Sequence, residues 1–532
     1  MSAAAQINTT NLLTILGVIA AVWAFIPQVS KLQLRFCMSR LDWAIVGFVF
    51  LLIHYLVFAP ALVQLGLYFS FGPWCFGFNS DTAVYVLLLM IATYFFWRTR
   101  SPKLVRGKVG IFREMIEALI LTKRYDELVL HVEPQLPKLI KFSRRTPSPS
   151  QLIYHVKRLP IFTLSANGGE RSTAMRKQRK KPNLITAWFS NRDKSKIQAR
   201  EILQSLVISS ELTRSLTLNH PYFCLKLLDT EESVLNDFTK EFLEAMLEAP
   251  GSQLYVELKN NKNLNGAARL AIPQSNRILR FFFEDPTVAV KLGVYQAIGD
   301  AVCRRLDEDK ALISKLNEPL GSYYDLGRYR CPINSGITLF EIMVHEGIHH
   351  GLHDHMWLHY FQHFARSILA QMQQIPEEPS FQEWPTPLHY LLARLFSVAI
   401  DWMEQCGRIK PPSTSLAIPT PEGFDKLYIS KEAAKSIGEM MQSIIPSTTI
   451  PVYFKRKLLG LVIASHNNLR GQLGLIGVAD ELNKATIFGT GMPAKCSYRS
   501  ALLTHFRELD HRLRDNAVQF EKDLDDALMN CP

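Results

Sequence analysis

The stretch from Trp43 to Phe69 reads WAIVGFVFLLIHYLVFAPALVQLGLYF and contains no Asp, Glu, Lys or Arg. Because roughly 20 helical residues cross the hydrocarbon core of a bilayer, this stretch is long enough to span a membrane. Two shorter uncharged runs, Leu12–Pro27 and Ala83–Trp97, lie on either side of it. The first run has neither the basic n-region nor the small-residue cleavage site of a signal peptide. The sequence therefore predicts three transmembrane helices, at about 12–27, 43–69 and 83–97.

Basic residues are unevenly distributed around these runs. The first predicted loop and the flank after the third run contain Lys31, Arg35, Arg40, Arg98, Arg100, Lys103, Arg106 and Lys108. The second predicted loop, 72–81, contains no basic residue. Because cytoplasmic loops carry an excess of Lys and Arg, we expect the N-terminus outside the cell and everything after Trp97 in the cytoplasm. This predicts a multi-pass protein of the cell membrane, inner or plasma, whose cytoplasmic cysteines are reduced.

The composition of the whole chain limits the class of protein. Of its 532 residues, 48% are hydrophobic and 20% are charged, so the chain is too apolar to be disordered and too long for one ordinary domain. Its eight cysteines are too dilute for a dense disulfide scaffold, and none of them forms a Cys-x-x-Cys pair. A net charge of +12 is typical of proteins that contact an anionic partner, such as a membrane surface or a nucleic acid.

Periodicity and composition divide the chain into segments. We expect a transmembrane anchor at 1–97, a juxtamembrane helical stalk at 98–143, a basic linker at 144–196 and a helical cytoplasmic region at 197–532. Two short segments, Gln253–Leu258 and Ile278–Phe283, have the composition of β-strands. The predicted fold class is therefore a membrane-anchored, mostly α-helical protein with at most a small β-hairpin.

The last predicted helix, 502–528, has apolar residues at alternating steps of three and four. They are Leu502, Phe506, Leu509, Leu513, Ala517, Phe520, Leu524 and Leu528. This spacing is close to a heptad seam. Such a seam packs against its own domain, or it binds a cytoplasmic protein partner or a second copy of the chain.

Histidines gather between positions 345 and 363, and the first of them begin a recognisable pattern. The sequence His345-Glu346-Gly347-Ile348-His349 matches HExxH. In a helix, two imidazoles four residues apart can bind one Zn²⁺, and the Glu between them can act as general base on a metal-bound water. These five residues resemble the signature of zinc metallopeptidases. The resemblance implies His345 and His349 as zinc ligands and Glu346 as the catalytic residue of a hydrolase.

The resemblance does not extend beyond those five residues. A metzincin-type third ligand corresponds to His355, but the Gly that should stand three residues after the second His is Leu352 here. A third ligand from a later helix, as in gluzincins, would be Asp401 or Glu404. The same histidines also fit a polar helix face hydrogen-bonded to carboxylates, or a pH sensor, because His titrates at about pH 6.5.

A basic run lies in the linker, at 171–196, and includes Trp188. Its cations are Arg171, Arg176, Lys177, Arg179, Lys180, Lys181, Arg192, Lys194 and Lys196. Such a run binds anionic lipid headgroups, or it binds nucleic-acid phosphates while Trp188 stacks on a base. A solvated linker has the same composition, so all three interpretations stay open.

The layout of the chain predicts a class of function. The cytoplasmic region is far larger than an anchor needs, and the apolar runs contain little of the polar character of a transporter. We therefore expect a membrane-tethered cytoplasmic sensor, effector or scaffold. This layout is similar to that of bacterial membrane effectors of antiviral defence, which join a few spans to a sensing domain. A membrane-anchored zinc hydrolase and a nucleic-acid or lipid binder are the alternatives.

Overall fold

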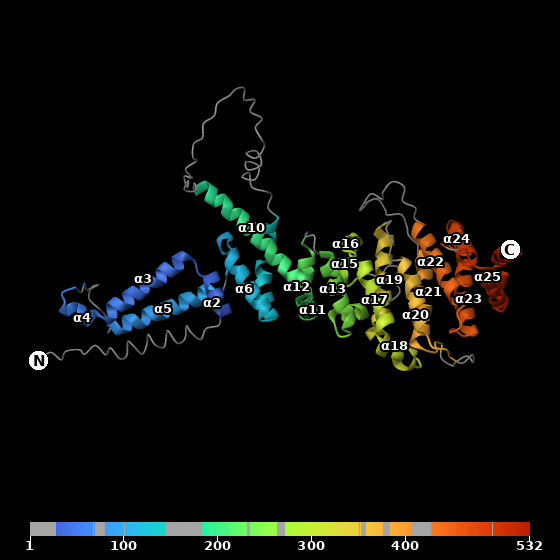
Figure 1. The fold of residues 1–532 in the computed structure, drawn as a ribbon, viewed down its shortest axis with the longest axis horizontal. Coiled ribbons are helices and arrows are strands. Elements are labelled where there is room, and N and C mark those ends of the chain that lie inside the picture. Colours follow the sequence, from blue (N-terminus) through green and yellow to red (C-terminus); the bar gives the residue numbers. More distant parts are fainter. Residues whose placement is uncertain are drawn as a thin grey trace, which may run out of the picture. The chain divides into compact units, whose positions relative to one another are not determined.

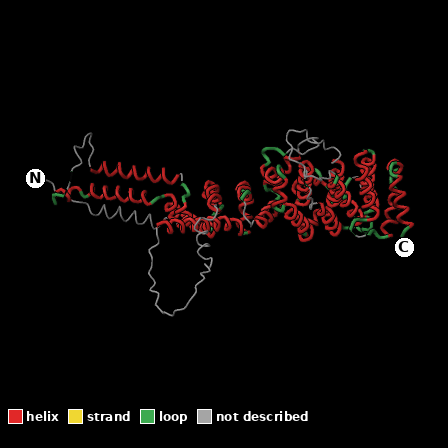
Figure 2. Tube along the Cα trace, turned by 90° about the horizontal axis from the view of Figure 1, so that it is seen from above, coloured by secondary structure: helices red, strands yellow, loops and turns green. Residues whose placement is uncertain are grey.

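The computed structural model describes the chain in several stretches. They are residues 28–67, 69, 80–100, 102–144, 184–230, 235–262, 272–350, 352, 358–375, 383–405, 427–491 and 493–531. The described residues are mostly helical and contain no β-strand, as Figure 2 shows, which confirms the predicted helical class. The chain divides into two compact units, Met1–Leu212 and Thr213–Pro532, here called the N-terminal and C-terminal units.

The described helices of the N-terminal unit pack in two groups. They are α2 (Gln28–Cys37), α3 (Arg40–Val57), α4 (Ala59–Gln64), α5 (Ser80–Arg100), α6 (Val109–Leu121), α7 (Tyr125–Val132), α8 (Leu136–Ser143) and α10 (Leu184–Ile208). Helices α3 and α5 pack side by side (Figure 1), whereas α2, α8 and α10 form a second group with α6. Within that group, the rings of Phe36 and Phe112 lie 4.9 Å apart. The residues predicted as a stalk are thus part of a packed helical group.

The apolar run predicted as one span at 43–69 is not one helix. A capping box between Ser39 and Asp42 starts α3, which ends at Val57. A short helix, α4, begins two residues later with Pro60 in its first turn. Proline has no N–H to donate and its ring obstructs the preceding turn, so it suits the start of a helix and not its interior. The prediction of one span over 43–69 is therefore wrong beyond Val57.

The C-terminal unit contains seventeen helices among its described residues. They are α11 (Ser210–Asn219, which begins just before the unit boundary), α12 (Pro221–Leu228), α13 (Leu235–Glu248), α14 (Gln253–Lys262), α15 (Arg277–Phe283), α16 (Pro286–Lys291), α17 (Val294–Glu308), α18 (Lys310–Asn317), α19 (Pro332–His350), α20 (Leu358–Gln371), α21 (Pro387–Gln405), α22 (Tyr428–Ile444), α23 (Val452–Arg470), α24 (Ile476–Phe488), α25 (Cys496–Arg507), α26 (His511–Asp515) and α27 (Val518–Met529).

Most of these helices are arranged in two rows. One row runs α17, α20, α22, α24 and α27, and the other runs α19, α21, α23 and α25; each helix packs on the next helix of its own row. Contacts between the rows, such as α21 with α22 and α23 with α24, close the core. Figure 1 shows these helices following one another in chain order along the unit. Stacking of successive helices into two rows is the arrangement of α-solenoids, although this sequence has no repeat of fixed period.

One glycine shows how closely two helices of a row approach. Gly438 lies in the middle of α22 and faces α24. A Cβ atom at this position would lie 2.6 Å from the carbonyl carbon and oxygen of Ala485. Real Cβ atoms essentially never come so close to backbone, so only glycine permits this packing distance.

The two segments predicted as β-strands are helices. Gln253–Leu258 begins α14 and Ile278–Phe283 forms most of α15. In α15 the buried side chains are Ile278, Leu279, Phe282 and Phe283, which is helical spacing. A short apolar run fits either a buried strand or a buried helix, and here packing against the neighbouring helices decided the outcome.

The long helix predicted at 502–528 is three helices, α25, α26 and α27. Asp510 caps α26 by accepting the Arg512 N–H at 2.8 Å, so the chain turns where the seam was expected to continue. The turn brings the rings of Phe506 and Phe520 to 5.3 Å from each other. The chain therefore buries much of its seam against itself and against α23 and α24, because folding back covers apolar surface that one long helix would expose.

The predicted boundary at residue 196 falls inside a helix, and the predicted division of the chain into segments stays a prediction. Helix α10 runs through this position without interruption, from Leu184 to Ile208, and the two compact units separate at Leu212. A further difference concerns the cysteines, because Cys496 and Cys531 form a disulfide bond where reduced thiols were expected.

Candidate functional site

The HExxH pattern lies in the last two turns of α19. His345 and Glu346 are buried, with exposed fractions of 4% and 2%, whereas His349 is exposed. The Nδ1 atom of His345 lies 2.7 Å from Oε1 of Gln405, the last residue of α21. With the amide oxygen of Gln405 as its partner, Nδ1 of His345 is the donor and Nε2 is the ring nitrogen left for a second partner. This is the tautomer that a metal-binding histidine needs at Nε2.

Glu346, the predicted catalytic residue, faces a different partner. One oxygen of its carboxylate lies 3.6 Å from Nδ1 of His350, and the same nitrogen donates to the Glu346 backbone carbonyl at 2.9 Å. The carboxylate is therefore enclosed in the fold beside an imidazole of its own helix. A general base must reach a water at the metal, and the catalytic role of Glu346 stays a prediction.

The third ligand of the predicted zinc site is not assembled among the described residues. Asp401 is exposed and Glu404 is half-buried on the last turns of α21, whereas His355 lies outside the described residues. Within the part of the chain that the structure describes, no three His, Cys, Asp or Glu side chains come together as metal ligands. Zinc binding by His345, His349 and His355 therefore stays a prediction.

Among the described histidines, the shift in pKa is largest at His389, which lies outside the HExxH pattern. His389 lies in the first turn of α21, where it is buried against the ring of Phe454 at 4.8 Å. Its Nδ1 atom lies 2.8 Å from Oγ1 of Thr386. Burial lowers its pKa from 6.5 to about 4, because an imidazolium would lose its hydration there. His389 is thus a neutral core residue, and no periodicity signal distinguishes it from a surface histidine.

The helices α3 and α5 present the second candidate site, an apolar surface. Both are long and apolar enough to cross a membrane, judged by length and composition, and the run 12–27 lies outside the described residues. Only 22% of the apolar window of α3 and 6% of that of α5 is buried. The exposed side chains include Leu41, Trp43, Ile45, Phe48, Phe50, Leu51, Val57, Tyr85, Leu88, Leu89, Met90, Phe96 and Trp97. A core helix of a soluble protein would bury such residues.

Polar groups within these two helices are bonded inside the helical pair. Nδ1 of His54 donates to the Phe50 carbonyl at 3.0 Å, and the Thr93 hydroxyl donates to the Leu89 carbonyl at 2.9 Å. At one end of the pair, Asp42 accepts from the Tyr94 hydroxyl at 2.7 Å and from the Arg98 guanidinium at 3.0 Å. Internal partners of this kind are what a lipid environment requires, because it offers no water to bond polar groups.

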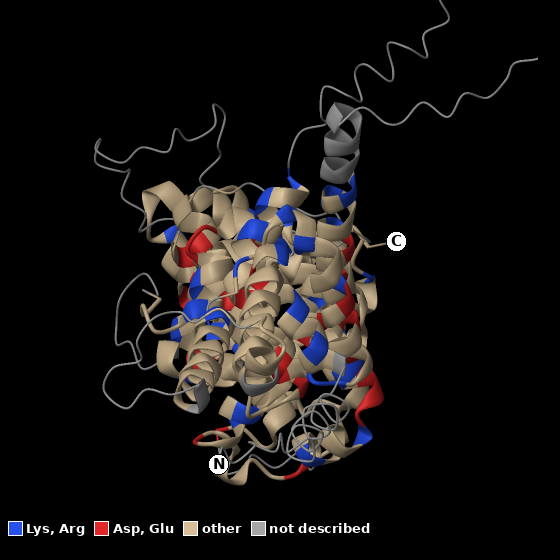
Figure 3. Cartoon of the chain, turned by 90° about the vertical axis from the view of Figure 1, so that its left-hand side faces the viewer, with Lys and Arg blue, Asp and Glu red and all other residues tan. Residues whose placement is uncertain are grey.

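The basic run 171–196 is only partly visible in the structure. Residues 171–183 lie outside the described residues, and the remainder forms the start of α10. Figure 3 shows Lys and Arg intermixed with Asp and Glu on the described helices. Lipid or nucleic-acid binding through this run stays a prediction.

No protein-family model, curated protein or solved structure matches the chain.

Proposed function

We propose that the protein is a membrane-anchored scaffold or sensor whose C-terminal unit binds a protein partner in the cytoplasm. The observation that carries the proposal is the exposure of the apolar side chains of α3 and α5. Covering that surface with lipid hydrocarbon removes it from water, at about 25 cal/mol per Å². The helices are about 27 and 31 Å long at 1.5 Å per residue, which fits a hydrocarbon core of about 30 Å.

The distribution of charge along α3 and α5 supports an orientation with the C-terminal unit in the cytoplasm. Arg40 at the start of α3 and Arg98 and Arg100 at the end of α5 share one end of the helical pair, the end at which Asp42 binds Arg98. Basic residues beside a span favour the cytoplasmic side. The C-terminal unit follows from that end and would lie in the cytoplasm.

The stacked rows of the C-terminal unit support a binding role. Stacked-helix proteins bury a continuous core and leave long outer faces that bind other macromolecules. Deeply buried side chains of α19 and α21, such as Phe340 and Trp402, hold the rows together. A rigid unit with extended faces suits a scaffold better than a catalyst with a single enclosed site.

A chain that begins at residue 28 tests the anchor without the first apolar run. We expect it to stay in the membrane pellet through carbonate extraction and to enter detergent. Leu51→Arg combined with Leu89→Arg places two charges mid-membrane at about 2.5–3.5 kcal/mol each and should release the chain. The matched control is Leu121→Arg with Leu130→Arg, two exposed leucines of α6 and α7. Release of the unsubstituted chain by carbonate, or equal retention of both variants, would contradict the proposal.

A zinc-dependent hydrolase is the second candidate, and the hydrogen bond between His345 and Gln405 favours it. That bond leaves Nε2 of His345 as the atom that a zinc ion would take. We expect a zinc protein to contain about one zinc per chain, lost in His345→Ala and in His349→Ala. Glu346→Gln should keep the metal and abolish hydrolysis. Zinc content unchanged by both histidine variants would exclude this site.

A further inference from the structure

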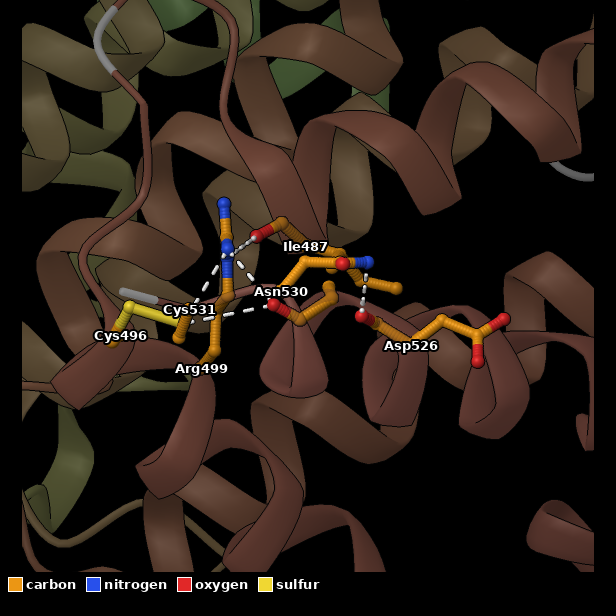
Figure 4. The surroundings of a disulfide bond; sticks show 7 residues. Ile487, Cys496, Arg499, Asp526, Asn530 and Cys531 are labelled. Carbon is orange, nitrogen blue, oxygen red and sulfur yellow. Dashed lines mark hydrogen bonds between the residues drawn. A yellow bond between two sulfur atoms is a disulfide. The ribbon is translucent and has the colours of Figure 1, made fainter.

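The disulfide bond between Cys496 and Cys531 encloses the last three helices of the chain. Cys496 is the first residue of α25, Cys531 follows the end of α27, and their Cα atoms lie 5.9 Å apart (Figure 4). The two cysteines are 35 positions apart in the sequence. We call the segment from Cys496 to Cys531, with α25, α26 and α27, the C-terminal cap.

The cap is the outermost layer of the stacked rows. Helix α27 packs on α24 and α25, and it buries Phe520, Leu524 and Ala527 against them. The outward stripe of α25 is polar and consists of Ser497, Ser500, Thr504 and Arg507. A terminal layer has neighbours on one side only, so it opens more easily than the layers between two neighbours. The cap is therefore where a covalent bond changes local stability most.

A cation stands directly beside the bonded sulfurs. The guanidinium of Arg499 donates from Nη1 to the Ala527 carbonyl at 3.1 Å and lies 3.7 Å from Sγ of Cys531. Its Nε donates to the Ile487 carbonyl at 3.2 Å, which fixes the guanidinium in place (Figure 4). Cys496 lies in the first turn of α25, where the helix dipole also favours a negative sulfur. Both surroundings favour the thiolate, which is the reactive form of cysteine.

The other described cysteines lie in surroundings of the opposite kind. Burial raises the thiol pKa of Cys37, Cys224, Cys303 and Cys331, to about 12 for Cys224 and to about 11 for Cys303. These thiols stay protonated at neutral pH and react slowly. Cys496 and Cys531 are only half-buried, so a small reagent in solvent reaches them.

We propose that Cys496 and Cys531 form a reversible thiol–disulfide switch that closes and opens the C-terminal cap, with a small disulfide of the glutathione class as co-reactant. In a reducing compartment, disulfides of this kind are transient and report the redox state. The proposal does not depend on membrane anchoring or on zinc binding, because it concerns only the cap.

The closing reaction is two successive thiol–disulfide exchanges. The Cys496 thiolate attacks one sulfur of the small disulfide, forms a mixed disulfide and displaces one thiolate. The Cys531 thiolate then attacks Sγ of Cys496 and displaces the second thiolate. The cap cysteines lose two electrons, the small disulfide gains them, and the protons of the two cap thiols pass to the two displaced thiolates. Excess of the small thiol reverses both steps.

The test uses the full chain in detergent, equilibrated with glutathione and glutathione disulfide at stepped ratios. Free thiols are trapped by alkylation and quantified by mass spectrometry, and amide hydrogen exchange is measured on the same samples. We expect the two cap cysteines to become alkylated together as glutathione increases. Closure of a loop of 35 positions corresponds to about 600-fold in an opening equilibrium, so reduction should speed exchange in α27 by up to about that factor. Exchange in α21, in the middle of the rows, should not change.

Three variants separate the switch from a general loss of structure. Cys496→Ser should give α27 the exchange rate of the reduced wild-type chain in both buffers, and Cys303→Ser should leave the switch unchanged. Arg499→Gln should slow reoxidation by glutathione disulfide, because it removes the cation beside Cys531. The proposal is overturned if no bond forms in excess glutathione disulfide, if excess glutathione does not reduce it, or if α27 exchanges equally in both states. The wild-type measurement decides even if a variant does not fold.

Discussion

Substitution of Gly438 by Ala tests whether the rows of the C-terminal unit pack as closely as described. The added Cβ would lie 2.6 Å from the carbonyl carbon and oxygen of Ala485, and 2.7 Å from its Cβ. That carbonyl also accepts from Nε2 of Gln442 at 3.3 Å, so α22 is already bonded to this part of α24. The backbone of α24 must therefore move if α22 gains a methyl group here.

The magnitude follows from two opposing effects. Overpacking of a well-filled core costs about 1–3 kcal/mol, whereas replacing Gly by Ala inside a helix contributes about 1 kcal/mol of stabilisation. We expect Gly438→Ala to lower the free energy of unfolding by up to about 2 kcal/mol. The matched control is Gly460→Ala in the middle of α23, where the nearest atom to an added Cβ, Cδ1 of Leu513, is 3.8 Å away. That variant should gain up to about 1 kcal/mol.

Urea titration of the full chain in detergent, with pulse proteolysis as the readout of unfolding, compares the two variants. Both changes add one methyl group to a helix interior, so differences in the unfolded chain cancel. The two variants should differ by the overpacking cost, about 1–3 kcal/mol, with Gly460→Ala the more stable. If Gly438→Ala is as stable as Gly460→Ala, then α22 and α24 do not approach as closely as described.

Three further predictions concern pH, topology and a buried carboxylate. Burial lowers the pKa of His389 from 6.5 to about 4, so between these pH values the imidazole is protonated in the unfolded chain but not in the folded one. The free energy of unfolding is therefore highest above pH 6.5 and falls as the pH decreases to about 4. In urea titrations, the free energy of unfolding should fall by about 3 kcal/mol more for the wild-type chain than for His389→Gln between pH 7 and pH 4. Equal losses in the two chains would refute the burial of a neutral His389. Leu473→Cys places a thiol at a position with 93% exposure, and a membrane-impermeant maleimide should label it only after cells are permeabilised; labelling in intact cells would contradict a cytoplasmic C-terminal unit. Glu257 is buried and accepts hydrogen bonds from the N–H groups of Ile278 at 2.9 Å and Leu279 at 3.1 Å. Glu257→Ala should therefore lower the free energy of unfolding by about 1–3 kcal/mol in thermal or urea unfolding, and an unchanged midpoint would argue against these two hydrogen bonds.

The sequence is informative about features that depend on residues close together in the chain. Helical periodicity correctly predicted the class of the fold, because most helices bury one face and the apolar residues recur accordingly. The uncharged runs at 43–69 and 83–97 correctly located apolar helices, although Pro60 ends the first of them earlier than expected. The HExxH pattern correctly indicated a helix, since α19 includes all five of its residues.

Tertiary structure decided the features that depend on distant parts of the chain. His345 and His349 look equivalent in the sequence, but His345 is buried beside Gln405 at the end of α21, whereas His349 is exposed. The seam at 502–528 looks continuous, but the fold-back at Asp510 buries it within one molecule. The two rows have no counterpart in a sequence repeat, because helices of different sequence stack equally well when their apolar faces match in shape. Local spacing therefore determined the helical class of the fold. The free energy of burying helix faces against one another decided the short apolar runs, the fold-back of the last helices and which side chains meet.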